Sequence, residues 1–179
     1  TEFLSWGITG AATLDVDSVI IPTRTGIDKL CLDGELEFSQ QLGLGWRNSP
    51  TALDGEYWIG DESGTLWHVS ANQSVNSYSI GEGKIRHQPL IIGDDNLLIH
   101  LQLPTESELH LLDTTTGEST TVAKLGPSPA MPETMNQYVI TADASYVTLI
   151  DCLENCQVIN QVPFTSNGEI SIIFDEYIV

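Results

Sequence analysis

Residues 48–70 read NSPTALDGEYWIGDESGTLWHVS, and this stretch decides the fold. Short runs rich in Val, Ile, Leu, Tyr, Trp and Thr alternate with turn signals, Asp54-Gly55 and then Asp61–Gly64. Such runs, bounded by Asp and Gly, are typical of β-strands joined by tight turns. The predicted strands of this unit are Pro50–Leu53, Glu56–Gly60, Thr65–Ser70 and Ser74–Ile80.

The same pattern recurs along the chain at a constant spacing. Five register marks, Ala11, Pro50, Pro89, Pro129 and Glu169, lie 39, 39, 40 and 40 residues apart. No stretch shows apolar residues at the three-and-four spacing of a helix over about ten residues. The chain is therefore predicted to be all-β, built from four-stranded antiparallel units.

Four antiparallel strands in about 40 residues is the size of one β-propeller blade. We expect residues 1–179 to form a single β-propeller domain or a fragment of one. The sequence predicts four full units and a partial one, at residues 8–46, 47–85, 86–126, 127–165 and 166–179. Because four and a half units is an unusual count for a closed ring, we expect that the remaining blades of a larger propeller, or a second copy in a dimer, complete the ring. A closed smaller ring is the alternative.

The repeat resembles that of the PQQ-like, or quinoprotein-type, β-propeller family. The resemblance rests on Asn48-Ser49-Pro50, on Tyr57–Gly60, and on Gly64–Trp67 after a Gly-containing hairpin. Residues 112–118, Leu-Asp-Thr-Thr-Thr-Gly-Glu, are similar to the Asp-x-x-Thr-Gly-Lys turn of the family. The resemblance implies a propeller fold and by itself implies no chemistry.

The resembled family has an enzymatic and a non-catalytic branch. The quinone-dependent dehydrogenases carry adjacent cysteines beside their cofactor, whereas Cys152 and Cys156 are separated by three residues. The other branch holds interaction scaffolds of the cell envelope, and the resemblance implies a non-enzymatic binding or scaffold module of this kind. The alternative is a segment of a quinone-dependent dehydrogenase or of another propeller enzyme. We expect no cofactor.

The chain is strongly acidic, with 25 Asp and Glu against 6 Lys and Arg and a formal net charge of −19. A field of this sign repels phosphate backbones and anionic lipid surfaces, so no nucleic-acid partner is expected. No apolar stretch approaches the ~20 residues of a membrane-spanning helix, so no direct membrane insertion is expected. The acidic excess is most simply a solvated surface, and the alternative is that it steers a basic partner by long-range attraction.

Two arginines mark the candidate binding site. Arg47 and Arg86 lie 39 residues apart, three residues before the register prolines, in the segments that lead into an innermost strand. With His87 beside one and Trp46 beside the other, two guanidiniums there suit a carboxylate or another anionic ligand. The alternatives are that each arginine pairs with an acid on an adjoining blade, and that Trp46 fills the gap between blades.

Cysteines and acidic pairs complete the set of candidates. Cys152 and Cys156 fit a local disulfide across a tight turn in an oxidising compartment, or else two unpaired thiols. An extracytoplasmic location, periplasmic or secreted, is expected, with the cytoplasm as the alternative. Acidic pairs such as Asp94-Asp95 fall at turn positions of the repeat, so no metal site is expected.

Overall fold

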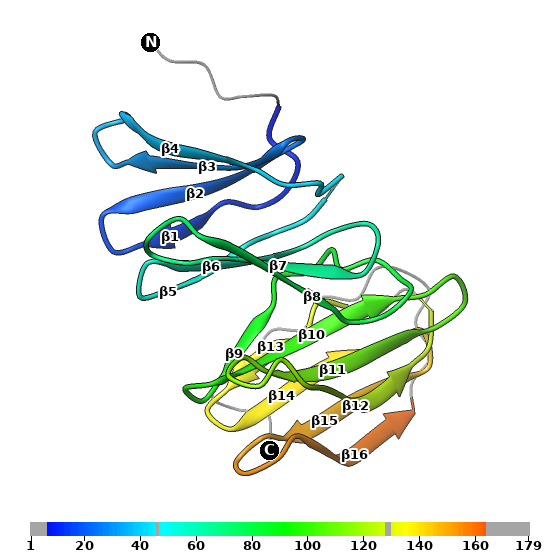
Figure 1. The fold of residues 1–179 in the computed structure, drawn as a ribbon. Coiled ribbons are helices and arrows are strands. Elements are labelled where there is room, and N and C mark those ends of the chain that lie inside the picture. Colours follow the sequence, from blue (N-terminus) through cyan, green and yellow to red (C-terminus); the bar gives the residue numbers. More distant parts are fainter. Residues whose placement is uncertain (1–6, 46, 128–129, 164–179) are drawn as a thin grey trace. The chain divides into compact units, whose positions relative to one another are not determined.

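The computed structural model describes residues 7–45, 47–127 and 130–163. It divides into two compact units, Thr1–Pro89 and Leu90–Val179 (Figure 1). Within its described residues each unit consists of two four-stranded antiparallel sheets, and no helix occurs there. The predicted all-β class and the four-stranded units are confirmed. The expected partial unit at 166–179 lies outside the described residues, and the assignment of all sheets to one propeller domain stays a prediction.

The first unit holds two sheets whose strands follow one another in chain order. Sheet 1 consists of β1 (Thr13–Asp15), β2 (Ser18–Thr23), β3 (Gly26–Cys31) and β4 (Leu36–Gln41). Sheet 2 consists of β5 (Thr51–Leu53), β6 (Glu56–Gly60), β7 (Thr65–Val69) and β8 (Val75–Ser79). The short inner strands β1 and β5 lie side by side (Figure 1).

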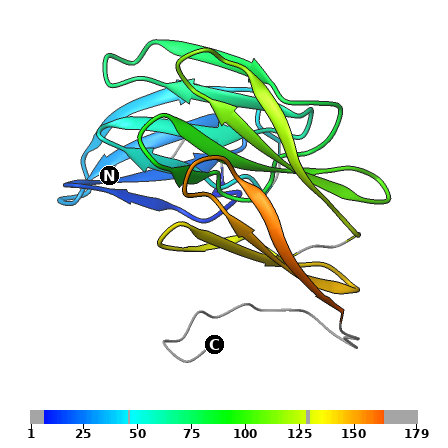
Figure 2. The same ribbon diagram turned by 90° about the horizontal axis from the view of Figure 1, so that it is seen from below.

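The second unit repeats this plan. Sheet 3 consists of β9 (Leu90–Ile92), β10 (Asn96–Gln102), β11 (Ser107–Asp113) and β12 (Ser119–Leu125). Sheet 4 consists of β13 (Glu133–Met135), β14 (Tyr138–Ala142), β15 (Tyr146–Asp151) and β16 (Gln157–Pro163). The longer β10–β11 hairpin closes at Leu103, whose N–H donates to the carbonyl of Glu106. In Figure 2 the orange β16 forms the edge of sheet 4, beside β15.

In sheets 2 and 4 an aspartate explains why the chain turns between the second and third strands. The Asp61 carboxylate accepts hydrogen bonds from the backbone N–H groups of Ser63 and Thr65, at 2.8 and 2.9 Å. Asp143 in sheet 4 accepts from Ser145 and Tyr146 in the same way, at 2.7 and 2.9 Å. A carboxylate that accepts hydrogen bonds from the backbone N–H groups of the residues after it fixes a tight turn, so the aspartate itself determines the hairpin geometry.

Each sheet has two faces, which the antiparallel register defines. Residues directly opposite each other share a face, and successive residues of one strand alternate between faces. We call one face of each sheet the trailing face and the opposite face the leading face. The trailing face carries Ile20 and Ile27 in sheet 1, Trp58 and Leu66 in sheet 2, Leu98 and Leu109 in sheet 3, and Ile140 and Val147 in sheet 4.

The core of each unit forms where a trailing face meets the next leading face. In the first unit Ile20 and Ile27 pack with Tyr57, Ile59 and Val69 of sheet 2. In the second unit the trailing face of sheet 3 packs against the leading face of sheet 4, with these buried members: Leu98, Leu109, Ala123, Leu125, Val139, Ile150 and Cys152. The same packing rule therefore operates in both units.

A polar network lies within the first of these cores. The Tyr57 hydroxyl donates to the Asp15 carboxylate at 2.9 Å, and Tyr57 is 1% exposed. The Lys29 ammonium lies 5.7 Å from the centre of the Tyr57 ring and donates to Glu37 at 3.2 Å. Partial burial acts to lower the pKa of Lys29, but the Tyr57 hydroxyl and the Glu37 carboxylate raise it overall. Lys29 therefore stays protonated between sheets 1 and 2.

Candidate functional site

The candidate arginines lie in the connecting segments of the first unit, 42–50 and 80–89. Leu44 and Ile85 anchor these segments, since both side chains are fully buried. Gly45 has φ +94°, and a Cβ there would lie 2.6 Å from Cγ of Glu62. Only glycine allows the first segment to cross so close to the β6–β7 turn that carries Glu62.

Hydrogen bonds align three successive segments of the repeat side by side. The Arg47 N–H donates to the Thr9 carbonyl at 2.9 Å, which ties the segment entering sheet 2 to the one entering sheet 1. The buried Asn48 amide donates to the carbonyl of Ile85 at 2.7 Å, and the Thr51 hydroxyl donates to the carbonyl of Pro89. The structure thus brings together the segments that carry Arg47 and Arg86.

Arg86 is fully engaged by a carboxylate. Its Nε and one terminal nitrogen donate to the two oxygens of Glu62 at 2.6 and 2.7 Å, a forked ion pair. The Lys84 ammonium lies 3.6 Å from the same carboxylate. The hydrogen bond from Arg86 holds the pKa of Glu62 below its usual range, and Glu62 in turn raises the pKa of Arg86. The guanidinium of Arg86 is therefore already paired with a carboxylate of this chain, which agrees with the alternative that the arginine pairs with an acid on an adjoining blade.

Arg47 occupies the same repeat position in a different state. Its side chain is exposed, and no ion pair joins it to a carboxylate within the described residues. Its backbone has φ +66°, in the left-handed region that costs a non-glycine residue free energy. An exposed, unpaired guanidinium on a strained backbone is open to an anionic group from outside.

The neighbours of the two arginines contribute differently. His87 is half-buried, and burial lowers the pKa of its imidazole, so it is neutral at pH 7. Trp46, the fourth predicted residue of the site, lies outside the described residues. Sequence reasoning missed Glu62, because nothing in the spacing links it to Arg86, which lies 24 residues further along the chain.

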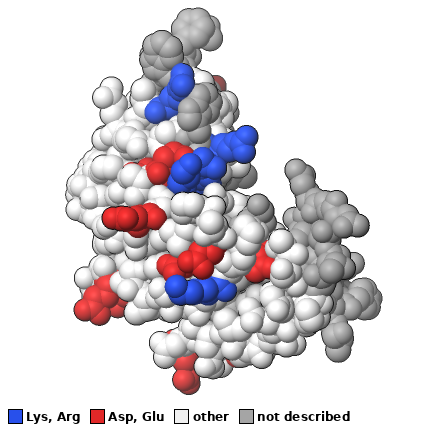
Figure 3. Space-filling model, turned by 90° about the vertical axis from the view of Figure 1, so that its right-hand side faces the viewer, with Lys and Arg blue, Asp and Glu red and all other residues white. Residues whose placement is uncertain are grey.

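Charge is unevenly distributed on the surface. On the face drawn in Figure 3 the few Lys and Arg side chains gather in small groups, and two of these groups adjoin carboxylates. Among the described residues, Lys84 and Arg86 lie against the Glu62 carboxylate, and Lys124 lies 2.9 Å from the Glu108 carboxylate. Most cations of the described surface are therefore neutralised locally.

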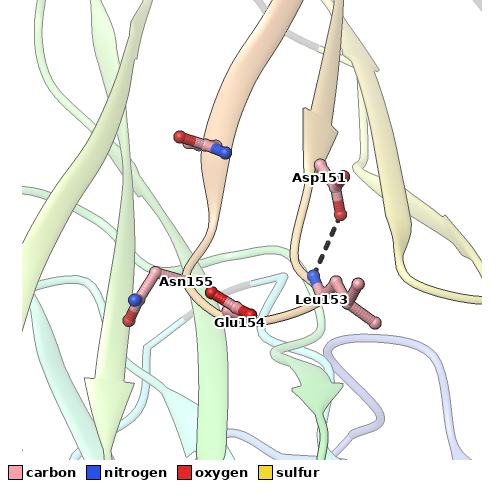
Figure 4. Close-up of a pocket in the computed structure, with 5 residues that line it drawn as sticks. Asp151, Leu153, Glu154 and Asn155 are labelled. Atoms are coloured by element: carbon pink, nitrogen blue, oxygen red, sulfur yellow. Dashed lines mark hydrogen bonds between the residues drawn. The ribbon is translucent and has the colours of Figure 1, made fainter.

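A pocket of about 230 Å³ lies at the β15–β16 hairpin, lined by Asp151, Leu153, Glu154, Asn155 and Gln157 (Figure 4). The Asp151 carboxylate accepts from the Leu153 N–H at 3.0 Å, and Cys152 and Cys156 form a disulfide in this hairpin. No three His, Cys, Asp or Glu side chains of the described residues are placed to hold a metal ion. Within the same residues no helix is long and apolar enough to cross a membrane.

Comparison with known proteins gives structural neighbours only. No family model and no curated protein sequence matches the chain. BamB from Moraxella catarrhalis shares 16% identity at a TM-score of 0.59, over 90% of this chain and 66% of BamB. NirN, a dihydro-heme d1 dehydrogenase, shares 14% identity at a TM-score of 0.64, over 86% of this chain and 37% of NirN.

These neighbours decide the fold. BamB and NirN are β-propellers. The four sheets are propeller blades. The designed protein Ika4 is similar as well, with 13% identity and a TM-score of 0.68 over 83% of this chain and 92% of Ika4. The chain spans less than two thirds of BamB and of NirN.

Proposed function

We propose that this chain is a non-enzymatic binding scaffold with PQQ-like propeller blades, which docks a protein partner on the segments that enter its sheets. The observation that carries the proposal is Arg47, which is exposed and has no ion-pair partner among the described residues, whereas Arg86, its repeat equivalent, is held by Glu62. The contact chemistry at Arg47 is a forked pair of hydrogen bonds to a carboxylate of the partner.

Rigidity of the segment supports this role. The Arg47 N–H donates to the Thr9 carbonyl, and the buried side-chain amide of the next residue, Asn48, donates to the Ile85 carbonyl. A guanidinium on a pre-ordered backbone loses less conformational entropy when it binds. Strained backbone at an exposed position also points toward function.

The net charge of −19 defines the rest of the partner surface. It attracts a basic surface and repels an acidic one, and salt weakens both effects. The partner that fits is therefore a protein with a basic contact surface in which one carboxylate faces Arg47.

We further propose an extracytoplasmic location. The disulfide between Cys152 and Cys156 supports it, because such bonds persist in oxidising compartments and are rare in the cytosol. Mass spectrometry of the protein from its native cells, alkylated without reduction, tests this: an intact bridge agrees, and two alkylated thiols contradict it.

The binding proposal is tested with two fluorescein-labelled lysine-rich peptides, identical except for a central Glu or Gln. Fluorescence anisotropy at 50 mM and 150 mM NaCl should show the wild-type chain preferring the Glu peptide about tenfold, which corresponds to ~1.4 kcal/mol. Arg47→Gln should abolish that preference. Lys124→Gln, which makes the same change in charge at the Lys124–Glu108 ion pair of sheet 3, should keep it. Equal affinities of the wild-type chain for both peptides would contradict the proposal.

A further inference from the structure

The trailing face of sheet 4 is open where the other trailing faces are closed. The two residues that define the trailing face of each sheet are at most 5% exposed in sheets 1, 2 and 3. In sheet 4 the same positions, Ile140 and Val147, are only half-buried. Val162 of β16, opposite Val147, is 52% exposed, whereas Ala123, opposite Leu109 in sheet 3, is 6% exposed. Among the described residues, the apolar trailing face of sheet 4 is therefore partly accessible, although Ala142, opposite Val147 on the same face, is buried.

Sheet 1 shows the complementary opening on its leading face. The positions of Tyr57 and Val69 in sheet 2 are buried, as are their equivalents in sheets 3 and 4. In sheet 1 the equivalent residues Val19 and Leu30 are only half-buried. Leu14, opposite Val19 on β1, is 77% exposed. Sheet 1 thus presents a partly exposed leading face, and leading faces are what trailing faces pack against in both units.

We infer that the trailing face of sheet 4 docks onto the leading face of sheet 1 in a second copy of this chain. Inside both units, trailing faces pack on leading faces, through Ile20 against Tyr57 and through Leu98 against Val139. The contact between copies repeats a packing that the molecule already uses twice. Burial of Val162, Leu14 and their half-buried neighbours supplies the hydrophobic driving force.

Coverage of both open faces favours two copies. A trailing-to-leading contact is heterologous, so it closes into a ring or continues as an open chain. Two copies joined by two such contacts cover both open faces of each copy, and a larger closed assembly gains no further contact per copy while it loses more translational freedom. The inferred assembly is therefore a closed pair of copies.

The charge of the chain sets the conditions for this assembly. Two copies of net charge −19 repel each other, and salt screens that repulsion while leaving apolar burial intact. Association should therefore tighten as salt rises. The inference concerns self-association and does not depend on a ligand at Arg47.

Light scattering coupled to size-exclusion chromatography tests the inference on the full chain, from 1 to 200 µM and in 50 mM to 1 M NaCl. The expected mass at high concentration and salt is twice the 19.5 kDa of the chain. Leu14→Asp and Val162→Asp, each alone, should run as monomers. An equimolar mixture of the two variants should regain a dimer, at least tenfold weaker than the wild type, because one intact contact remains.

A matched variant and two contrary outcomes make the test sharp. Thr120→Asp adds the same charge at an exposed position of β12 and should leave the dimer intact. Circular dichroism should show the strand signal unchanged in all three variants, because each replaced side chain is exposed. A wild-type monomer under every condition would overturn the inference. A dimer that survives Leu14→Asp alone would overturn it as well, since the contact would then join two like faces.

Discussion

Leu98 in sheet 3 and Ile140 in sheet 4 occupy the same position of the repeat, on the second strand and the trailing face. Leu98 is 2% exposed and lies in the core against sheet 4, whereas Ile140 is only half-buried. Both residues are branched aliphatics of similar size. The difference in exposure therefore comes from the neighbouring sheet. Each blade has two apolar packing faces, and a face stays exposed where no sheet covers it.

The largest expected effect comes from truncating these two side chains. Leu98→Ala should lower the free energy of unfolding by about 2–5 kcal/mol, because it leaves a cavity between two sheets. Ile140→Ala should cost less than half of that in dilute solution, where its face is open. Urea unfolding at 1 µM protein measures both values. Equal losses would show that Ile140 is covered within the single chain.

Reduction of the disulfide tests the covered side of sheet 4. Cys152 is 9% exposed and belongs to the core between sheets 3 and 4. Opening a loop of this length should cost roughly 2 kcal/mol, since the unfolded chain regains conformational freedom. Unfolding with and without reductant gives the value. The Cys152→Ser, Cys156→Ser double variant should show no response to reductant, and a response there would mean that the effect has another source.

Loss of one hydroxyl tests the polar part of a covered leading face. Tyr57→Phe removes the donor to Asp15, a carboxylate that is 8% exposed. The expected loss is about 1–2 kcal/mol, because the buried carboxylate keeps its desolvation without that partner. Tyr146→Phe, at an exposed tyrosine, is the control and should change stability by less than about 0.5 kcal/mol. Equal effects would contradict the network.

The smallest expected effect concerns two arginines at the same repeat position. Arg86 is paired with Glu62, whereas Arg47 has no ion-pair partner among the described residues. Because Arg86 lowers the pKa of Glu62 in the folded state, this pair stabilises the fold above the ordinary Glu pKa of 4.5 and less as pH falls through the lowered value. Glu62→Gln should flatten the loss of stability between pH 5 and 3 by less than about 1 kcal/mol. Thermal unfolding against pH measures this. Arg47→Gln should leave the acid limb unchanged, and a matching change would mean that Arg47 too is paired.

The strands were predictable because their signals are local. Glu56–Gly60 appears in the structure with the predicted bounds, since apolar runs and turn residues fix both ends. The outer strand of sheet 2 is shorter than predicted, Val75–Ser79 instead of Ser74–Ile80. Turn residues lie within one blade and need no knowledge of neighbours.

The site was less predictable because its state depends on long-range neighbours. Sequence spacing placed Arg47 and Arg86 at equivalent positions but could not distinguish the paired arginine from the open one. That distinction depends on Glu62, which reaches Arg86 from the β6–β7 turn of the preceding sheet. Likewise, Ile140 and Leu98 occupy the same repeat position, and only the structure shows which of the two is covered.

Thiol accessibility measures the central contrast most directly. In a Cys31→Ser background, Leu98→Cys and Ile140→Cys each place a single reduced thiol at the same repeat position of sheets 3 and 4. At 1 µM protein under native conditions, a maleimide reagent should label the Ile140→Cys thiol at least a hundredfold faster than the Leu98→Cys thiol. Equal rates would show that both trailing faces are covered alike and would contradict the account.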